Sequence, residues 1–196
     1  VIAGATGLHP ADVMSERLWA PMGAESDANV GLDAVGAGMF DGGCSATLRD
    51  LARFGSLFLH DGHALDGVPV LPPAWVADTF TGGPDSRAAF AAASEPTLME
   101  GGMYRNGFWF PGPTADVALA LGIHGQMVYI NRATGVVAAK LSTWPTPQDG
   151  EKLLGASDGQ GFEHIGDRLA LVVECGDAGL GDFGFRGQVG DPGHQF

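Results

Sequence analysis

The string Gly-Ile-His-Gly-Gln at positions 122–126 is the stretch whose residue types and spacing most suggest chemistry. Histidine is the side chain that most often transfers protons in enzymes, and His124 stands between two glycines. Glycine weakens a strand, so Gly122 and Gly125 mark either a kink or a place where a ligand or another backbone comes close. Taken alone, the string favours the kink.

Short apolar runs border this string, at Val117–Leu121, Met127–Ile130 and Val136–Leu141. Runs of this length separated by glycine-containing turns predict buried antiparallel strands. The connection Asn131–Gly135 predicts a hairpin closed by a type I turn, in which Gly135 supplies the positive φ.

The clearest helix begins after Thr47, a good N-cap residue with Asp50 three positions later, and it ends at Gly62. Its apolar positions share one face, and they are Leu48, Leu51, Ala52, Gly55, Phe58 and Leu59. The opposite face is expected to carry Arg49, Asp50, Arg53 and Ser56.

Two other groups could do chemistry. Cys44 lies just before this helix, and a helix N-terminus can lower a thiol pKa and make the sulfur nucleophilic. The sequence implies no neighbouring histidine, so a bystander cysteine is the favoured interpretation. His60 and His63 could form half of a metal site, but two histidines in a glycine-rich turn favour solvent exposure. We therefore expect no metal and no cofactor.

The 122–126 string, followed by an aromatic strand, a glycine turn, an apolar strand and Leu-Ser-Thr-Trp-Pro at 141–145, resembles the penicillin-recognising serine hydrolases. This superfamily includes class C β-lactamases, DD-peptidases, related esterases and 6-aminohexanoate-dimer hydrolase, and the last looks most similar. The string Gly-Gly-x-x-Ala-Thr-Leu-Arg-Asp-Leu-Ala-Arg-Phe-Gly at 42–55 is a common structural signature of the superfamily. The resemblance covers Val1 to about Pro147.

The resemblance implies an α/β (α+β) fold of the β-lactamase/transpeptidase type, with an antiparallel sheet flanked by helices and incomplete on its N-terminal side. Residues 1–148 would be the C-terminal portion of such a hydrolase domain, and residues 149–196 a glycine-rich acidic tail that is partly disordered or diverged. The first residue is not Met and no signal peptide is recognisable, so we expect the chain to begin partway through a longer protein.

The resemblance also implies a mechanism. A serine in Ser-x-x-Lys would attack a carbonyl to form an acyl-enzyme, and the lysine and a tyrosine in Tyr-x-Asn would move the protons. No serine of this sequence has a lysine three positions later. Tyr104 and Tyr129 each begin a Tyr-x-Asn, but both fall in expected strands, which is the wrong context for that motif. We therefore expect the chain to be inactive alone.

One catalytic element remains. In relatives, Lys-Thr-Gly or His-x-Gly occupies a strand beside the nucleophile, and residues 120–122 would take that place without the cation. The backbone N–H of Ile123 would then donate to the oxyanion, while Gly122, His124 and Gly125 would border the substrate. Another register puts His124 in the cationic position. A hydrogen-bonded sheet histidine without a catalytic role is an equally good interpretation.

Composition limits the alternatives. A formal net charge of −13 argues against nucleic acid and anionic membrane surfaces as partners. The two cysteines form no disulfide framework and fit a reducing compartment such as the cytoplasm. The 32 glycines favour a loop-rich α/β protein over a helical bundle.

The remaining stretches predict further elements. Residues 1–7 predict a helix end stopped by Gly7, and residues 10–19 and 72–80 predict helices that open on proline. Residues 88–93 predict a single helical turn, and residues 104–110 an aromatic strand. In the tail, residues 151–154 could begin a helix and residues 165–174 could form a strand or short helix.

Two hypotheses follow. The chain is either the C-terminal part of a serine hydrolase acting on a small-molecule amide or ester, or a non-catalytic remnant or binding module that keeps the sheet and the cleft wall. In either case an exposed sheet edge would favour self-association.

Overall fold

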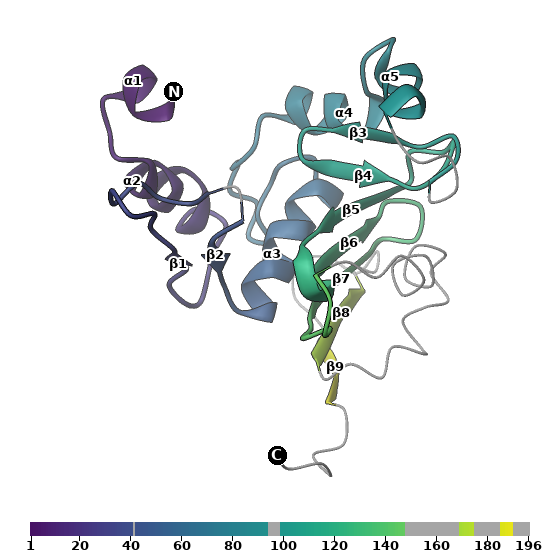
Figure 1. The fold of residues 1–196 in the computed structure, drawn as a ribbon. Coiled ribbons are helices and arrows are strands. Elements are labelled where there is room, and N and C mark those ends of the chain that lie inside the picture. Colours follow the sequence, from purple (N-terminus) through teal and green to yellow (C-terminus); the bar gives the residue numbers. More distant parts are fainter. Residues whose placement is uncertain (41, 94–98, 148–168, 175–184, 190–196) are drawn as a thin grey trace.

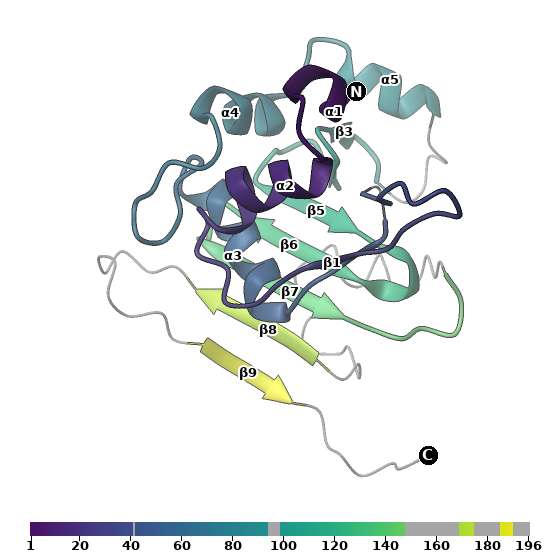
Figure 2. The ribbon, with the colours of Figure 1, turned by 90° about the vertical axis from the view of Figure 1, so that its left-hand side faces the viewer.

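The computed structural model describes residues 1–40, 42–93, 99–147, 169–174 and 185–189, the last two segments by their backbone alone. Their strands form a seven-stranded antiparallel sheet in the order β3-β4-β5-β6-β7-β8-β9, in which each strand pairs with its neighbour in the chain. Helix α3 lies across one face of this sheet, and α1, α2, β1 and β2 lie beyond α3 (Figures 1 and 2). The expected antiparallel sheet flanked by helices is confirmed.

The sheet begins with β3 (Met103–Arg105) and β4 (Phe108–Phe110) and continues with β5 (Val117–Leu121), β6 (Met127–Asn131) and β7 (Val136–Leu141). The three strands expected around the 122–126 string are thereby confirmed. The hairpin after β6 and the positive φ of Gly135, at 69°, are confirmed, and the Asn131 Oδ1 accepts hydrogen bonds from the N–H groups of Ala133 and Thr134.

The single aromatic strand expected at 104–110 is wrong, because β3 and β4 are two strands of a tight hairpin. Asn106 and Gly107 form its turn with φ values of 50° and 88°. Positive φ at both central positions is the geometry that Asn-Gly favours, because it matches the right-handed twist of the paired strands. The Asn-Gly pair is the signal that distinguishes a hairpin from one continuous strand.

The helix α3 (Leu48–Leu59) begins as predicted, with the Asp50 N–H donating to the Thr47 Oγ1 at 3.1 Å. It packs against β6 and β7 so closely that a Cβ on Gly55 would lie 2.6 Å from the Val137 Cγ1. This contact explains the glycine, since any side chain would push the helix off the sheet.

The polar face expected for α3 is partly wrong. Asp50 and Ser56 are buried rather than exposed. Asp50 accepts hydrogen bonds from the Glu25 N–H at 2.8 Å and from the Arg53 Nη1 at 3.1 Å, so its carboxylate ties the helix to the preceding chain. Arg49 and Arg53 bind the Glu25 carboxylate, and these two guanidinium groups, Arg49 first, hold the pKa of Glu25 below its ordinary value.

The other helices are α1 (Ile2–Thr6), α2 (Pro10–Met14), the π-helix η1 (Ser15–Trp19), α4 (Pro73–Thr81) and α5 (Ser86–Ala93). Gly7 ends α1 with a φ of 70°, as predicted, and the predicted helix at 10–19 is α2 continued by η1. Two short strands, β1 (Asn29–Val30) and β2 (Cys44–Ser45), pair outside the main sheet.

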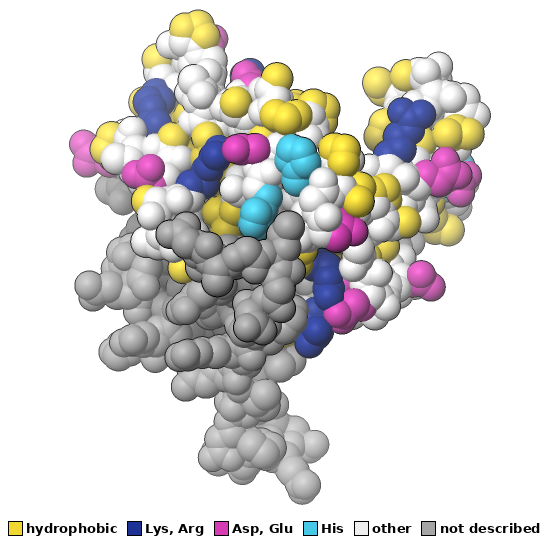
Figure 3. All heavy atoms as spheres, turned by 180° about the vertical axis from the view of Figure 1, so that it is seen from behind, with side chains coloured by type: hydrophobic (Ala, Val, Ile, Leu, Met, Phe, Trp, Pro, Cys, Tyr) yellow, Lys and Arg dark blue, Asp and Glu magenta, His cyan; other side chains and the backbone are white. Residues whose placement is uncertain are grey.

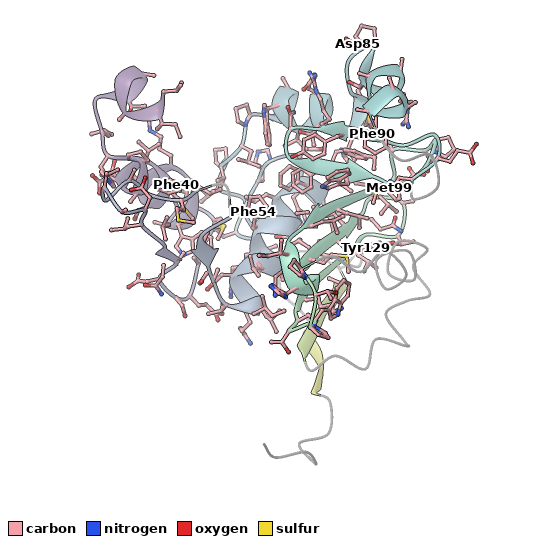
Figure 4. The ribbon with its side chains drawn as sticks, in the orientation of Figure 1. Phe40, Phe54, Asp85, Phe90, Met99 and Tyr129 are labelled. Carbon is pink, nitrogen blue, oxygen red and sulfur yellow. The ribbon has the colours of Figure 1, made fainter. Side chains whose placement is uncertain are left out.

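The core lies on both faces of the sheet. Phe54 of α3 packs with the cluster on one face, and Phe90, Met99 and Tyr129 belong to the cluster on the other (Figure 4). Basic and acidic side chains lie beside one another on the surface seen in Figure 3 rather than gathering into a patch of one sign. Among the described residues, no helix is long and apolar enough to cross a membrane.

In the tail, β8 (Leu169–Glu174) pairs with β7, and β9 (Phe185–Val189) pairs with β8. A strand is therefore confirmed over 169–174. The helix start considered at 151–154 and residues 165–168 lie outside the described residues. The domain division at residue 148 stays a prediction.

Candidate functional site

The residues Gly122–Gln126, here called the 122–126 loop, connect β5 to β6. The Gly122 N–H donates to the Gln126 carbonyl at 2.9 Å. At the tip, η2 (Ile123–Gly125) is a tight turn in which the Gln126 N–H donates to the Ile123 carbonyl at 3.4 Å and in which His124 and Gly125 both have positive φ. The strand β5 ends at Leu121, so the string lies in a tight hairpin loop beside the last residue of the strand.

His124 is the strained residue of this loop. Its φ of 57° and ψ of 23° place it in the left-handed region, where a residue with a Cβ pays about 1–2 kcal/mol. The His124 N–H donates to the Pro147 carbonyl at 2.9 Å, and the His124 carbonyl accepts from the Trp144 N–H at 3.1 Å. These bonds to a second segment hold the strained turn in place.

The His124 ring is bound to the same segment. Its Nδ1 lies 2.8 Å from the Trp144 carbonyl oxygen, and a carbonyl can only accept, so Nδ1 carries the proton. In the neutral ring, Nε2 then carries the lone pair. The structure thus brings His124 into the hydrogen-bonded state that a structural histidine would have, while leaving one ring nitrogen chemically able to accept a proton.

Gln126 joins the loop to the strand end after β7. Its Nε2 donates to the Ser142 carbonyl at 2.5 Å, and its Oε1 accepts from the Ser142 N–H at 3.0 Å. The side-chain amide thereby pairs with the backbone as a neighbouring strand would. Sequence reasoning did not single out Gln126, although it belongs to the string that carried the resemblance.

Gly125 lies against the indole of Trp144. A Cβ on Gly125 would be 2.4 Å from Cε2 and 2.5 Å from Cδ2 of that ring, and the Gly125 φ is 83°. Both requirements exclude any other residue. Trp144 is itself buried and stacks with the buried Lys140, whose Nζ lies 4.5 Å from the ring centroid. Sequence reasoning did not assign Trp144 a role, because its contact with Gly125 is not local in sequence.

Ile123 stands at the tip of the loop. The residue is 62% exposed, and within the part of the chain that the structure describes its N–H meets no hydrogen-bond acceptor. An N–H without an acceptor, on an exposed residue of a loop held by hydrogen bonds to Ser142, Trp144 and Pro147, is chemically a preorganised donor. Such a group can bind an oxyanion with little rearrangement.

The other candidate residues are placed less favourably for chemistry. Cys44 lies on β2, and partial burial raises the pKa of its thiol, which makes it less reactive rather than more. Tyr104 and Tyr129 lie in strands, as expected, and the Tyr129 hydroxyl accepts from the Asn131 Nδ2 at 3.0 Å.

The two histidines considered as half of a metal site are half-buried rather than fully exposed. The His60 and His63 Nδ1 atoms each lie beside a backbone carbonyl, at 2.8 and 3.0 Å. Within residues 1–40, 42–93 and 99–147, no three His, Cys, Asp or Glu side chains gather as metal ligands would.

Comparisons with known proteins agree with the architecture. The chain is 35% identical over 147 residues to the 6-aminohexanoate-dimer hydrolase of Paenarthrobacter ureafaciens, and the match covers 75% of this chain and 37% of that protein. A solved structure from Bacillus anthracis, provisionally assigned as a 6-aminohexanoate-dimer hydrolase, superposes with a TM-score of 0.65 at 27% identity. That match covers 84% of this chain and 39% of the other. No protein-family model matches the chain.

The antiparallel sheet with a helix across it thus matches part of the fold of a class of hydrolases. Both similarities support the penicillin-recognising serine hydrolase-like family, the group that includes 6-aminohexanoate-dimer hydrolases. The chain spans about two fifths of the length of the relatives that it matches, at 37% and 39%.

Proposed function

We propose that this chain forms the sheet-side wall of the active site in a serine hydrolase that cleaves small-molecule amides or esters through an acyl-enzyme. The Ile123 N–H is one donor to the oxyanion. The observation that carries this proposal is that Ile123 is exposed and that its N–H has no acceptor in the described residues, while His124 beside it is bound through its backbone to a second segment.

The other loop residues have supporting roles in this proposal. Gly122 is exposed beside the donor, and a Cβ there would lie 3.0 Å from the Gln126 Cβ, so the glycine leaves this side of the loop without a side chain of its own. His124 borders the substrate through the imidazole whose Nδ1 is bound to Trp144. Gly125 is buried against the Trp144 indole, so it contributes to substrate binding through the shape of the backbone.

The nucleophile and its base come from a segment outside these 196 residues in this proposal. No serine in the sequence has the Ser-x-x-Lys spacing that would place a lysine one helical turn away. The chain alone is therefore expected to be inactive. A hydrolase in which this segment meets the serine-bearing segment would be active without a metal or another cofactor.

A substitution at Ile123 tests the donor directly. Ile123→Pro removes the N–H, and Gly122, with φ −117° and ψ 163°, is already extended as a residue before proline must be. In the complete hydrolase that contains this segment, loss of one oxyanion donor should lower kcat about a hundredfold or more.

Ile123→Ala is the matched control, because it removes the same side chain and keeps the N–H. Its kcat should stay within a few-fold of the parent. Equal activity of Ile123→Pro and Ile123→Ala would contradict the oxyanion role.

The second candidate is a non-catalytic binding module that retains the sheet and the cleft wall. The observation in its favour is that the residues that hold the 122–126 loop by hydrogen bonds all belong to this chain, so the shape of the loop does not depend on a catalytic partner. A purified natural protein that binds small amides and never hydrolyses them would favour this candidate.

A further inference from the structure

The 122–126 loop depends on one residue outside it. His124 keeps its left-handed conformation through bonds to the backbone N–H and carbonyl of Trp144, in addition to the bond from its own N–H to Pro147. A strained residue keeps its conformation only where its surroundings over-determine it. Trp144 contributes two of these restraints through its backbone alone.

The indole of Trp144 adds a third restraint. The ring atoms closest to a Cβ on Gly125 are Cε2 and Cδ2, the two carbons shared by both rings. Each of these atoms is bonded to three ring neighbours, so close approach is possible only from above the ring plane. Gly125 therefore packs against the face of the indole, and the ring supports the loop from that side.

The indole is also fixed from its own side. The Lys140 Nζ lies 4.5 Å from the ring centroid, within the range of a cation–π interaction, and both side chains are buried, at 1% and 7% exposure. Buried contacts of this kind restrict ring rotation, because neighbouring atoms leave no room for another rotamer. The indole against which Gly125 packs is thus held in one orientation.

We propose that Trp144 is a positioning residue for the 122–126 loop. Its backbone holds His124 and its indole supports Gly125, and together these contacts fix the direction of the N–H of Ile123, the residue that precedes them. The inference rests on the function proposed for that N–H, but the placement of the loop by Trp144 can be measured without any catalytic activity.

The experiment uses the ¹⁵N-labelled 196-residue chain with Trp144→Phe and Trp144→Ala. Nuclear magnetic resonance follows the hydrogen exchange of the His124 amide and its three-bond N–H to Hα coupling, which reports φ. In Trp144→Phe, exchange of the His124 amide should be about tenfold faster, because local opening exposes a bonded N–H. In Trp144→Ala the coupling should also leave the value for positive φ.

Two comparisons separate positioning from a general loss of stability. Trp75→Phe makes the same chemical change in α4, at a residue that is 39% exposed and whose ring lies tilted against Phe58, and should leave the His124 amide unchanged. The amides of β6 should exchange at parental rates in all three variants.

An unchanged His124 amide in Trp144→Phe would overturn the inference, and so would equal acceleration at His124 and throughout β6. If Trp144→Ala does not fold, Trp144→Phe still decides the matter. These results differ from a failure of the proposed function, which would show as equal activity of Ile123→Pro and Ile123→Ala.

Discussion

The side-chain amide of Gln126 pairs with the backbone of Ser142 in both directions, donating at 2.5 Å and accepting at 3.0 Å. This pair continues the ladder between β6 and β7 one step beyond Met127 and Lys140, where the two backbones separate. The loop that presents Ile123 is therefore anchored on the β7 side by a side chain that takes the place of a strand.

Replacing that side chain should destabilise the protein. Gln126→Met keeps the length of the side chain and removes both hydrogen bonds to Ser142, which is buried. Leaving buried backbone groups without these bonds should cost about 1–3 kcal/mol of unfolding free energy. Urea denaturation measures this change, and a loss smaller than the error of the fit would show that the pair contributes nothing.

Adding one methyl group at Gly125 should be costly. Gly125→Ala places the Cβ 2.4 Å from a rigid ring carbon of Trp144 and forces alanine to a φ of 83°. Overpacking and backbone strain together should lower the unfolding free energy on the order of 2–4 kcal/mol.

Gly112→Ala is the matched control, because Gly112 has open space around its Cβ position. Its unfolding free energy should change by about 0.5 kcal/mol or less. Similar losses in the two variants would contradict the account of the Trp144 contact.

The ion pair between α4 and β3 should make stability depend on pH. Asp78 binds the Arg105 guanidinium through both carboxylate oxygens, at 2.7 and 2.9 Å, and also accepts from the Asn106 Nδ2. Arg105 first and Asn106 second hold the pKa of Asp78 below its ordinary value of 3.8. The stabilisation is therefore complete above 3.8 and is lost as the pH falls below it through the folded-state pKa.

Asp78→Asn removes this dependence. We expect melting curves of the parent and of Asp78→Asn to differ at neutral pH and to converge as the pH falls below the ordinary carboxyl value. Because the pair is on the surface, the difference should shrink in high salt. Parallel curves at all pH values would show that another carboxylate is responsible.

Association of the isolated chain is the fourth prediction. Tyr104 lies in β3, which ends the sheet on one side among the described strands, and its side chain is 49% exposed. An open strand edge invites pairing with a second copy. Light scattering after gel filtration should give a mass above 20.2 kDa for this chain.

Two variants distinguish association through the β3 edge from association through an exposed apolar residue elsewhere. Tyr104→Lys places a charge on the edge and should lower the mass, whereas Val35→Glu acts at an 88% exposed residue away from the sheet and should not. A monomer that melts cooperatively would contradict the prediction of self-association.

Much of the fold was accessible from local patterns. The strands on both sides of the 122–126 loop, the cap at Thr47 and the positive φ of Gly135 each follow from residues adjacent in sequence. The hairpin at Asn106 was not predicted, because the aromatic residues on both sides of it form a pattern that is also typical of one continuous strand. The burial of Asp50 could not be predicted from helical periodicity, because the carboxylate is buried through a hydrogen bond from the backbone N–H of Glu25, a residue outside the helix.

The site was accessible only in part. The resemblance pointed to Ile123 and its neighbours, and the structure places them together on one loop. The restraints on that loop come from Ser142, Trp144 and Pro147, which lie 16 to 23 residues beyond their partners Gln126 and His124 in the chain. Which side chain rests on which glycine is decided by packing between segments, and no local pattern encodes it.

The most direct test of the account is labelling of the purified natural protein with a fluorophosphonate probe, followed by peptide mapping of the adduct. We predict one adduct, on a serine of a Ser-x-x-Lys segment outside these 196 residues, and none on the 20.2 kDa chain expressed alone. An adduct on a serine within the chain, or no adduct on the natural protein, would contradict the proposed hydrolase.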